Sequence, residues 1–223
     1  MLIVGDLHGK KELLYPLLRS NQENYVFLGD FGFVWKWAEL YRSKVLSKLE
    51  RSYNSKNFFV IPGNHENYDA IESVPITYYQ KTKVRAIRSN IFYIERGEIL
   101  NLEGKTILCL GGADSVDKSL RIAQEEAGLG KVWWPQEQIK LGDMTKAVRN
   151  CGGQVDYVFT HDVPFQVKAE IYPRAIETKS DILLGSLMRQ VEYKEWYCGH
   201  LHLSYYSDKN RVRILKEGEA IEL

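Results

Sequence analysis

Short apolar runs alternate with helix-like stretches over the first part of the chain. The runs at residues 2–4, 25–28 and 58–61 have the length and composition of buried strands. The stretches at 10–18 and 35–49 repeat their apolar residues with helical spacing. Strand–helix–strand alternation predicts a parallel sheet whose connections cross over with a right hand.

The middle of the chain carries strand patterns without helices between them. Four apolar runs, at residues 84–87, 91–94, 98–100 and 106–110, follow one another closely, and Gly104 marks a hairpin turn. We expect these strands to be antiparallel partners.

The last part of the chain again mixes both patterns. The predicted elements are helices at 116–126, 135–149 and 182–190, strands at 157–160 and 195–198, and two or three short strands within 203–222 that turn at 208–210. Two sheets stacked face to face, with helices outside, accommodate all of these elements. No linker or repeat interrupts the sequence, so we expect one domain over residues 1–223.

Composition and charge limit the classes of function. The chain has 44% hydrophobic and 26% charged residues, which excludes a disordered protein, and its net charge of +1 gives no general attraction to nucleic acid or membranes. No apolar run approaches the ~20 residues that span a bilayer, and the N-terminus lacks a signal-peptide pattern. Three cysteines without a CxxC pair indicate reduced thiols and a cytoplasmic protein.

Polar motifs follow five of the predicted strands. All five histidines of the protein lie in them, together with aspartate and asparagine. The motifs are Gly5-Asp6-Leu7-His8-Gly9, Gly29-Asp30, Gly63-Asn64-His65-Glu66, Thr160-His161-Asp162 and Gly199-His200-Leu201-His202. Functional groups of open α/β sheets collect beyond the carboxyl ends of strands, so these side chains are expected to meet at one place.

The residue types indicate a metal centre. Imidazole and carboxylate together suit manganese, iron or zinc, whereas calcium prefers oxygen ligands alone. The absence of thiolates from the motifs disfavours a closed structural zinc site. A carboxylate has two oxygens and bridges two cations where an imidazole cannot, and Asp30 is the candidate bridge.

The ordered motifs resemble those of the calcineurin-like metallophosphoesterase superfamily: Asp-x-His, Gly-Asp, Gly-Asn-His-Asp/Glu, a later histidine, and Gly-His-x-His. The resemblance implies a four-layer α/β/β/α sandwich of two mixed sheets and two divalent metal ions, with manganese favoured over iron or zinc. It assigns one metal to Asp6, His8, Asp30 and His202, and the other to Asp30, Asn64, His161 and His200.

The same resemblance implies an activity. The expected reaction is attack of a metal-bridging hydroxide on phosphorus, with His65 protonating the leaving group and Glu66 ordering its loop. The sequence leaves open a phosphomonoesterase or a phosphodiesterase of small or broad substrates, with nucleic acid only as a substrate. The alternative is a non-catalytic scaffold that keeps the sandwich for protein binding. The oligomeric state is not indicated.

Substrate contacts are less clear from the sequence. The Asp-Arg-Gly motif of the protein serine/threonine phosphatases, whose arginine grips phosphate, is missing after Gly29-Asp30. Lys118 and Arg121, three residues apart on a predicted helix, either bind substrate phosphate or form a solvated helix face. Phe31 and Phe33 either lie at the rim of the site or belong to the core.

Overall fold

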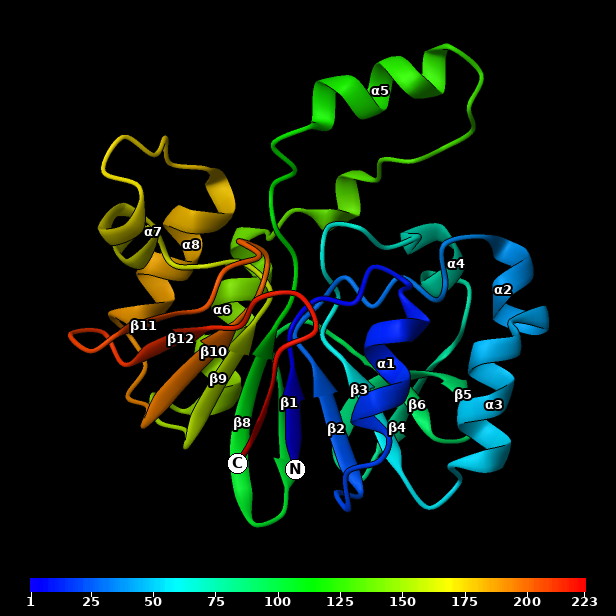
Figure 1. The fold of residues 1–223 in the computed structure, drawn as a ribbon. Coiled ribbons are helices and arrows are strands. Elements are labelled where there is room, and N and C mark those ends of the chain that lie inside the picture. Colours follow the sequence, from blue (N-terminus) through cyan, green and yellow to red (C-terminus); the bar gives the residue numbers. More distant parts are fainter.

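Two mixed β-sheets form the centre of the structure (Figure 1). This computed structural model describes the backbone of residues 1–223 and the side chains of all of them except Trp37, Tyr41 and Arg42. The chain termini lie side by side, because the backbone nitrogen of Leu223 donates to the carbonyl oxygen of Met1 at 3.0 Å.

The first sheet has seven strands in the order β13-β1-β2-β3-β6-β5-β4. Its four central strands are parallel, as the alternating pattern near the N-terminus predicts, and the outer strands are antiparallel. The strands are β1 (Leu2–Val4), β2 (Asn24–Phe27), β3 (Asn57–Val60), β4 (Ile76–Tyr79), β5 (Thr82–Arg88), β6 (Ile91–Ile94) and β13 (Ala220–Glu222).

The second sheet has six strands in the order β11-β12-β10-β9-β8-β7. Strands β12, β10, β9 and β8 are parallel, and an antiparallel strand closes each edge. The strands are β7 (Glu98–Leu102), β8 (Lys105–Leu110), β9 (Tyr157–Thr160), β10 (Glu195–Cys198), β11 (Tyr205–Ser207) and β12 (Val212–Ile214).

Helices cover the outer face of each sheet, which completes the expected four layers (Figure 1). The helices are α1 (Lys11–Leu17), α2 (Trp37–Arg42), α3 (Lys44–Ser52), α4 (Tyr68–Glu72), α5 (Lys118–Glu126), η1 (Pro135–Glu137, a 3₁₀ turn), α6 (Leu141–Cys151), α7 (Phe165–Ile171) and α8 (Lys179–Met188). None of these helices, over the residues described, combines the length and apolar character needed to cross a bilayer.

Alternation along the strands divides the core into three clusters. In β1, Leu2 and Val4 pack with the helices outside the first sheet, whereas Ile3 points between the sheets. Phe59 of β3 and Phe159 of β9 meet in the same middle cluster. Continuous apolar runs are therefore needed, because both faces of the central strands are buried.

Two predicted helices are wrong in detail. The pattern at 35–49 is divided into α2 and α3 at Ser43, whose φ of −62° and ψ of 120° are not helical and whose side chain accepts from Leu46 N. The pattern at 135–149 is divided by extended residues after η1, since Ala113 and Arg96 bind the carbonyl of Glu137. Apolar spacing stays in phase across both breaks, so periodicity alone does not reveal them.

The prediction for the middle strands is correct in part. Strands β5 and β6 are antiparallel partners, as are β7 and β8, but the chain changes sheet between β6 and β7. Three short elements, α4, β4 and α7, were not predicted from the sequence. The predicted strands at 157–160 and 195–198 coincide with β9 and β10.

Candidate metal centre

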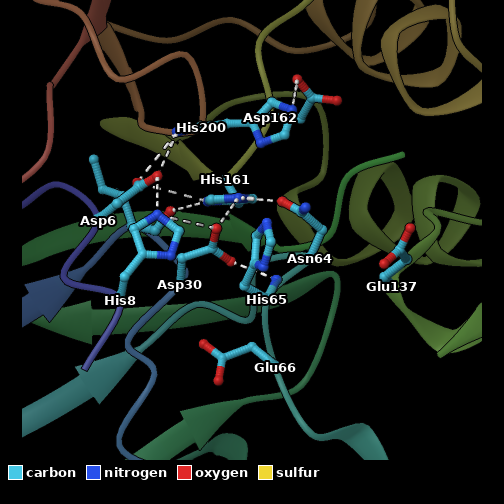
Figure 2. A network of polar contacts seen from close by, with 12 residues as sticks. Asp6, His8, Asp30, Asn64, His65, Glu66, Glu137, His161, Asp162 and His200 are labelled. Atoms are coloured by element: carbon cyan, nitrogen blue, oxygen red, sulfur yellow. Dashed lines mark hydrogen bonds and ion pairs between the residues drawn. The ribbon is translucent and has the colours of Figure 1, made fainter. Parts of the chain in front are cut away.

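Six of the seven predicted ligands lie together beyond the strand ends in Figure 2, and His202 joins them through its contacts with His8 and Asp6. Five strands present them, although the most distant pair is separated by almost the whole chain. The ligands and their strands are Asp6 and His8 after β1, Asp30 after β2, Asn64 after β3, His161 after β9, and His200 and His202 after β10. The convergence is the one expected from carboxyl ends of parallel strands.

Asp6, His8 and His202 form one group of potential ligand atoms within 4.8 Å of one another. The Nε2 atoms of the two histidines approach to 3.0 Å, and Nε2 of His202 lies 3.1 Å from a carboxylate oxygen of Asp6. Two imidazole nitrogens and a carboxylate thus point at one location, which fits a cation. His202 is half-exposed, so this side of the centre is open to solvent.

Asp6, Asp30 and His161 form a second such group, and all three are buried. Nε2 of His161 lies 2.9 Å from the side-chain oxygen of Asn64 and 3.5 Å from Oδ2 of Asp30. Nδ1 of His161 lies 2.8 Å from the carbonyl oxygen of Leu28, which only accepts, so Nδ1 carries a hydrogen. Nε2 is then the nitrogen that faces a cation, as in metal sites whose histidines donate to a backbone carbonyl.

Asp30 stands between the two groups. The same Oδ2 atom that faces His161 lies 3.8 Å from Nε2 of His8. Its other oxygen accepts from the backbone nitrogen of His65 at 2.7 Å. Asp6 also belongs to both groups, so the bridging role of Asp30 stays a prediction.

Electrostatics at the centre favour bound positive charge. Burial opposes ionisation of Asp30, but the charge of His161, a hydrogen bond to it and the charges of His65 and His8 outweigh burial and hold its pKa below the ordinary range. Burial would lower the pKa of His161, yet Asp30 and Asp6 raise it to about 10. The positive charge of the protonated His161 ring stabilises the carboxylates of Asp30 and Asp6. A divalent cation bound between these side chains would supply the same positive charge, so the donor set fits a metal.

Backbone strain is concentrated at the ligands. Seven non-glycine residues have positive φ, and four of them are predicted ligands: His8 (47°), Asp30 (46°), His200 (66°) and His202 (52°). The left-handed region costs an ordinary residue roughly 1–2 kcal/mol. Such strain persists where the surrounding structure imposes it, and it gathers at functional sites.

Two glycines of the motifs allow close packing of ligands. A Cβ atom at Gly29, whose φ is 109°, would overlap the ring of His161. A Cβ atom at Gly63 would overlap the carboxylate of Asp30. Glycine is therefore required at both positions, because the predicted ligand across the site occupies the space that a side chain would need.

His65 and Glu66 have different roles. The ring of His65 lies at the centre, 5.2 Å from the ring of His8 between centroids, and burial lowers its pKa. Glu66 points away from the ligands, accepts from the backbone nitrogen of Phe31 at 3.0 Å and bonds the hydroxyl of Tyr93 at 3.1 Å. Burial and the nearby charge of Asp30 raise the pKa of Glu66 to about 8. These contacts agree with the expectation that Glu66 orders its loop.

Phe31 and Phe33 are in the core, not at the rim. Phe31 has no exposed surface and Phe33 only 6%, and both pack in the cluster outside the first sheet. Of the two alternatives that the sequence left open for these residues, the rim position is wrong, because Glu66 anchors the backbone of Phe31 so that its ring packs inward against Phe27. The aromatic ring beside His65 is instead Trp35, at 6.5 Å between centroids.

Lys118 and Arg121 do not share one solvated face. The side chain of Arg121 is buried and donates to the carbonyl oxygen of Val132 and to Oγ of Ser115. Lys118 remains on the surface of α5 with its ammonium 4.2 Å from the ring centroid of Trp133. Arg121 therefore holds together the loop that carries α5, and only Lys118 remains as a candidate phosphate contact.

Sequence reasoning missed a buried group behind Asn64. Nδ2 of Asn64 donates to Oγ of Ser115 at 3.0 Å, and this hydroxyl donates to Glu137 at 2.8 Å. Ser115 lies just before α5, the helix that carries Lys118 and Arg121, but its contact with Asn64 has no sequence signal. The bonds orient the amide so that its oxygen faces His161.

Comparison with known proteins agrees with the geometry. The family model for the calcineurin-like phosphoesterases matches residues 1–204, which include all seven predicted ligands and His65. A search of curated proteins finds no match.

Proposed function

Because the chain belongs to the calcineurin-like phosphoesterase family, we propose that it is a hydrolase of phosphate esters that works with two divalent metal ions. The family points to metal-dependent cleavage of phosphate esters, and the two ligand groups, which share Asp6, support this reaction here. Manganese is the proposed metal, with iron or zinc as alternatives, because imidazole and carboxylate donors suit all three.

The side chains divide the work of the reaction. When bound, two such cations supply a hydroxide at neutral pH and draw the phosphoryl oxygens toward them. Asp6, Asp30 and the four histidines at positions 8, 161, 200 and 202 hold this charge, with Asn64 completing the set. His65 then donates a proton to the departing oxygen, for which its place beside His8 and outside both ligand groups is suited.

Substrate contacts are proposed on the side of His65. A hollow of about 320 Å³ adjoins Trp35 and is lined by Asn67, Lys131 and Trp134 among others. Since the leaving group departs toward its proton donor, this hollow is a suitable place for it. Its size supports a small substrate, and Lys118 is proposed to attract the phosphate. The rates measured in the test below distinguish a monoester substrate from a diester substrate.

A scaffold that only binds proteins is less consistent with these observations. Such a protein does not require strained ligands, yet four of the predicted ligands have positive φ. A cytoplasmic location remains part of the proposal. It is supported by the three cysteines, all free in the structure as described.

The test is hydrolysis with and without metal. We expect chelated protein to be inactive and to recover with manganese. Rates for para-nitrophenyl phosphate, bis-para-nitrophenyl phosphate, cyclic nucleotides and short oligonucleotides would then identify the subclass. His65→Ala serves as the matched control for contaminating activity, because it should keep its metal and lose turnover. Purified protein that binds no manganese, iron or zinc would favour the scaffold instead.

A further inference from the structure

A chain of three buried charges leads away from His200. Asp162 is 1% exposed, Lys168 of α7 is 9% exposed, and Asp181 of α8 is fully buried. The ammonium of Lys168 lies 2.5 Å from Oδ1 of Asp181 and 3.3 Å from Oδ1 of Asp162. Charged side chains are rarely buried without a specific partner or function.

Asp162, at one end of this row of buried charges, lies next to His200 of the candidate metal centre. Oδ1 of Asp162 lies 3.8 Å from Nε2 of His200, and the ring of His200 packs edge-on against that of His161 with centroids 4.9 Å apart (Figure 2). The other oxygen of Asp162 is buried and has no hydrogen-bond partner among the described side chains and backbone groups. Oδ1 already accepts from the backbone nitrogen of Val163 at 2.8 Å, whereas an unpartnered buried oxygen is costly, so the carboxylate of Asp162 has capacity to accept one more donor.

The opposite end is fixed to the helices outside the second sheet. Oδ2 of Asp181 accepts from the backbone nitrogen of Thr178 at 3.0 Å, and the hydroxyl of Thr178 accepts from Asp181 N at 3.2 Å. This capping box begins α8. Lys168 therefore fixes the position of the Asp162 carboxylate, and Asp181 in the first turn of α8 fixes the position of the Lys168 ammonium.

The charge balance also calls for a cation. Two carboxylates and one ammonium carry a formal charge of −1 if all are ionised, within an interior that solvates charge poorly. A metal ion beside His200 would offset this charge. A histidine ligand that donates its second nitrogen to a carboxylate is fixed in orientation and is a stronger donor to the metal.

We propose that Asp162 is a positioning residue for His200: it accepts a hydrogen bond from Nε2, so that Nδ1 is the atom offered to the metal. Lys168 and Asp181 hold the carboxylate in place. Hydrogen bonds in catalytic sites are often long before the site is loaded, so we expect the present 3.8 Å between these atoms to shorten in metal-loaded protein. This inference rests on the proposed function, because it requires a metal at His200.

The experiment measures metal binding directly. Asp162→Ala and Asp162→Asn are titrated with Mn²⁺, with bound metal counted by elemental analysis and spin-coupled pairs detected by electron paramagnetic resonance. We expect the alanine variant to bind one of its two ions roughly 10- to 100-fold more weakly and to lose most of the coupled signal. The asparagine variant keeps an acceptor oxygen without the charge and should fall between alanine and wild type.

A matched control removes a carboxylate elsewhere. Asp156 accepts from Thr106 at 2.8 Å and pairs with Lys194, and Asp156→Ala should leave Mn²⁺ binding unchanged. Circular dichroism checks that each variant is folded. If Asp162→Ala does not fold, the Mn²⁺ affinity of Asp162→Asn is the deciding measurement. Unchanged affinity in a folded Asp162 variant overturns this inference alone. Wild-type protein that binds no metal overturns the proposed function as well.

Discussion

The side-chain nitrogen of Asn64 donates to the hydroxyl of Ser115 at 3.0 Å, although 51 positions separate the two residues. Ser115 begins the loop that carries α5 and Asn64 follows β3, so the loop and the predicted ligand share one buried bond. Arg121 donates to the same hydroxyl at 2.7 Å, and Ser115 in turn donates to Glu137. The hydroxyl thereby connects the orientation of a predicted ligand with both ends of this loop.

Ser115→Ala should weaken metal binding. Without the hydroxyl, the amide of Asn64 loses the partner that selects its orientation, and affinity for one metal should fall by roughly 10-fold. Isothermal titration with Mn²⁺ would measure the change. Ser73→Ala, which removes a hydroxyl bonded to Ala70 O at 2.7 Å, is the control and should bind as the wild type does. Equal affinities in both variants would contradict the ordering role.

Asp30→Asn and His65→Ala should both lose most turnover, but for different reasons. Asn in place of Asp30 removes a charge that faces both ligand groups, so bound metal should fall together with the rate. His65→Ala should keep its metal and lose roughly 10²- to 10⁴-fold in kcat, the usual contribution of a general acid. Elemental analysis and steady-state kinetics separate the two. Near-normal activity of either metal-loaded variant would refute the role of that residue.

Phe31→Ala should act on stability. Its ring is fully buried against Phe27 and Phe33, and removing such a ring costs about 3–5 kcal/mol of unfolding free energy. Urea denaturation would measure the loss. Phe31→Leu keeps most of the volume and should be milder. A large rise in KM without loss of stability would restore the rim position instead.

Arg121→Met should lower the stability of the protein, whereas Lys118→Met should affect substrate binding. Loss of Arg121 leaves Glu137 buried without its ion partner at 3.5 Å, which should destabilise the protein by about 3–5 kcal/mol. Lys118→Met should leave stability nearly unchanged and raise KM if its ammonium attracts phosphate. Thermal unfolding and Michaelis constants of the two variants provide the comparison. An unchanged KM for Lys118→Met would reduce Lys118 to a surface residue.

Asp114 should contribute an acid-sensitive part of the stability. Burial raises its pKa, but hydrogen bonds from Ser180, Gln138 and Thr178 prevail and lower it below 3.8. The unfolded chain then binds the proton more readily, so this stabilisation is complete above the unfolded pKa and is lost as the pH falls through the folded pKa.

The comparison of wild type with Asp114→Asn tests this dependence. The variant should be less stable at neutral pH by about 1 kcal/mol, because Oδ2 of Asp114 accepts from Ser180 N at 2.8 Å. The difference should shrink as the pH falls from the ordinary aspartate pKa through the lower pKa of the folded state, where the wild-type carboxyl becomes protonated too. Urea unfolding at several pH values measures it. A difference that is constant with pH would show that the charge is not the cause.

The sequence by itself determined the central strands and the site at their ends. The strands at 157–160 and 195–198 are mostly apolar because both faces of these strands are buried, and this makes them visible without a structure. The predicted ligands were visible as well, because glycine, histidine and aspartate recur directly after strands. Parallel strands bring their carboxyl ends to one edge, so the approximate meeting place followed from the order of elements alone.

Only the tertiary structure decided which partner each side chain meets. Periodicity tells which side of an element is apolar, but not whether β7 joins β6 or a second sheet, nor that Ser43 interrupts a regular helical pattern. The sequence left open a rim or a core position for Phe31 and predicted Arg121 on an exposed helix face. In the structure both are buried, by contacts with Phe27 and Ser115 respectively. The pairing of Asp162 with Lys168 and Asp181 arises where α7 and α8 pack together, because buried charges are matched in space rather than along the sequence.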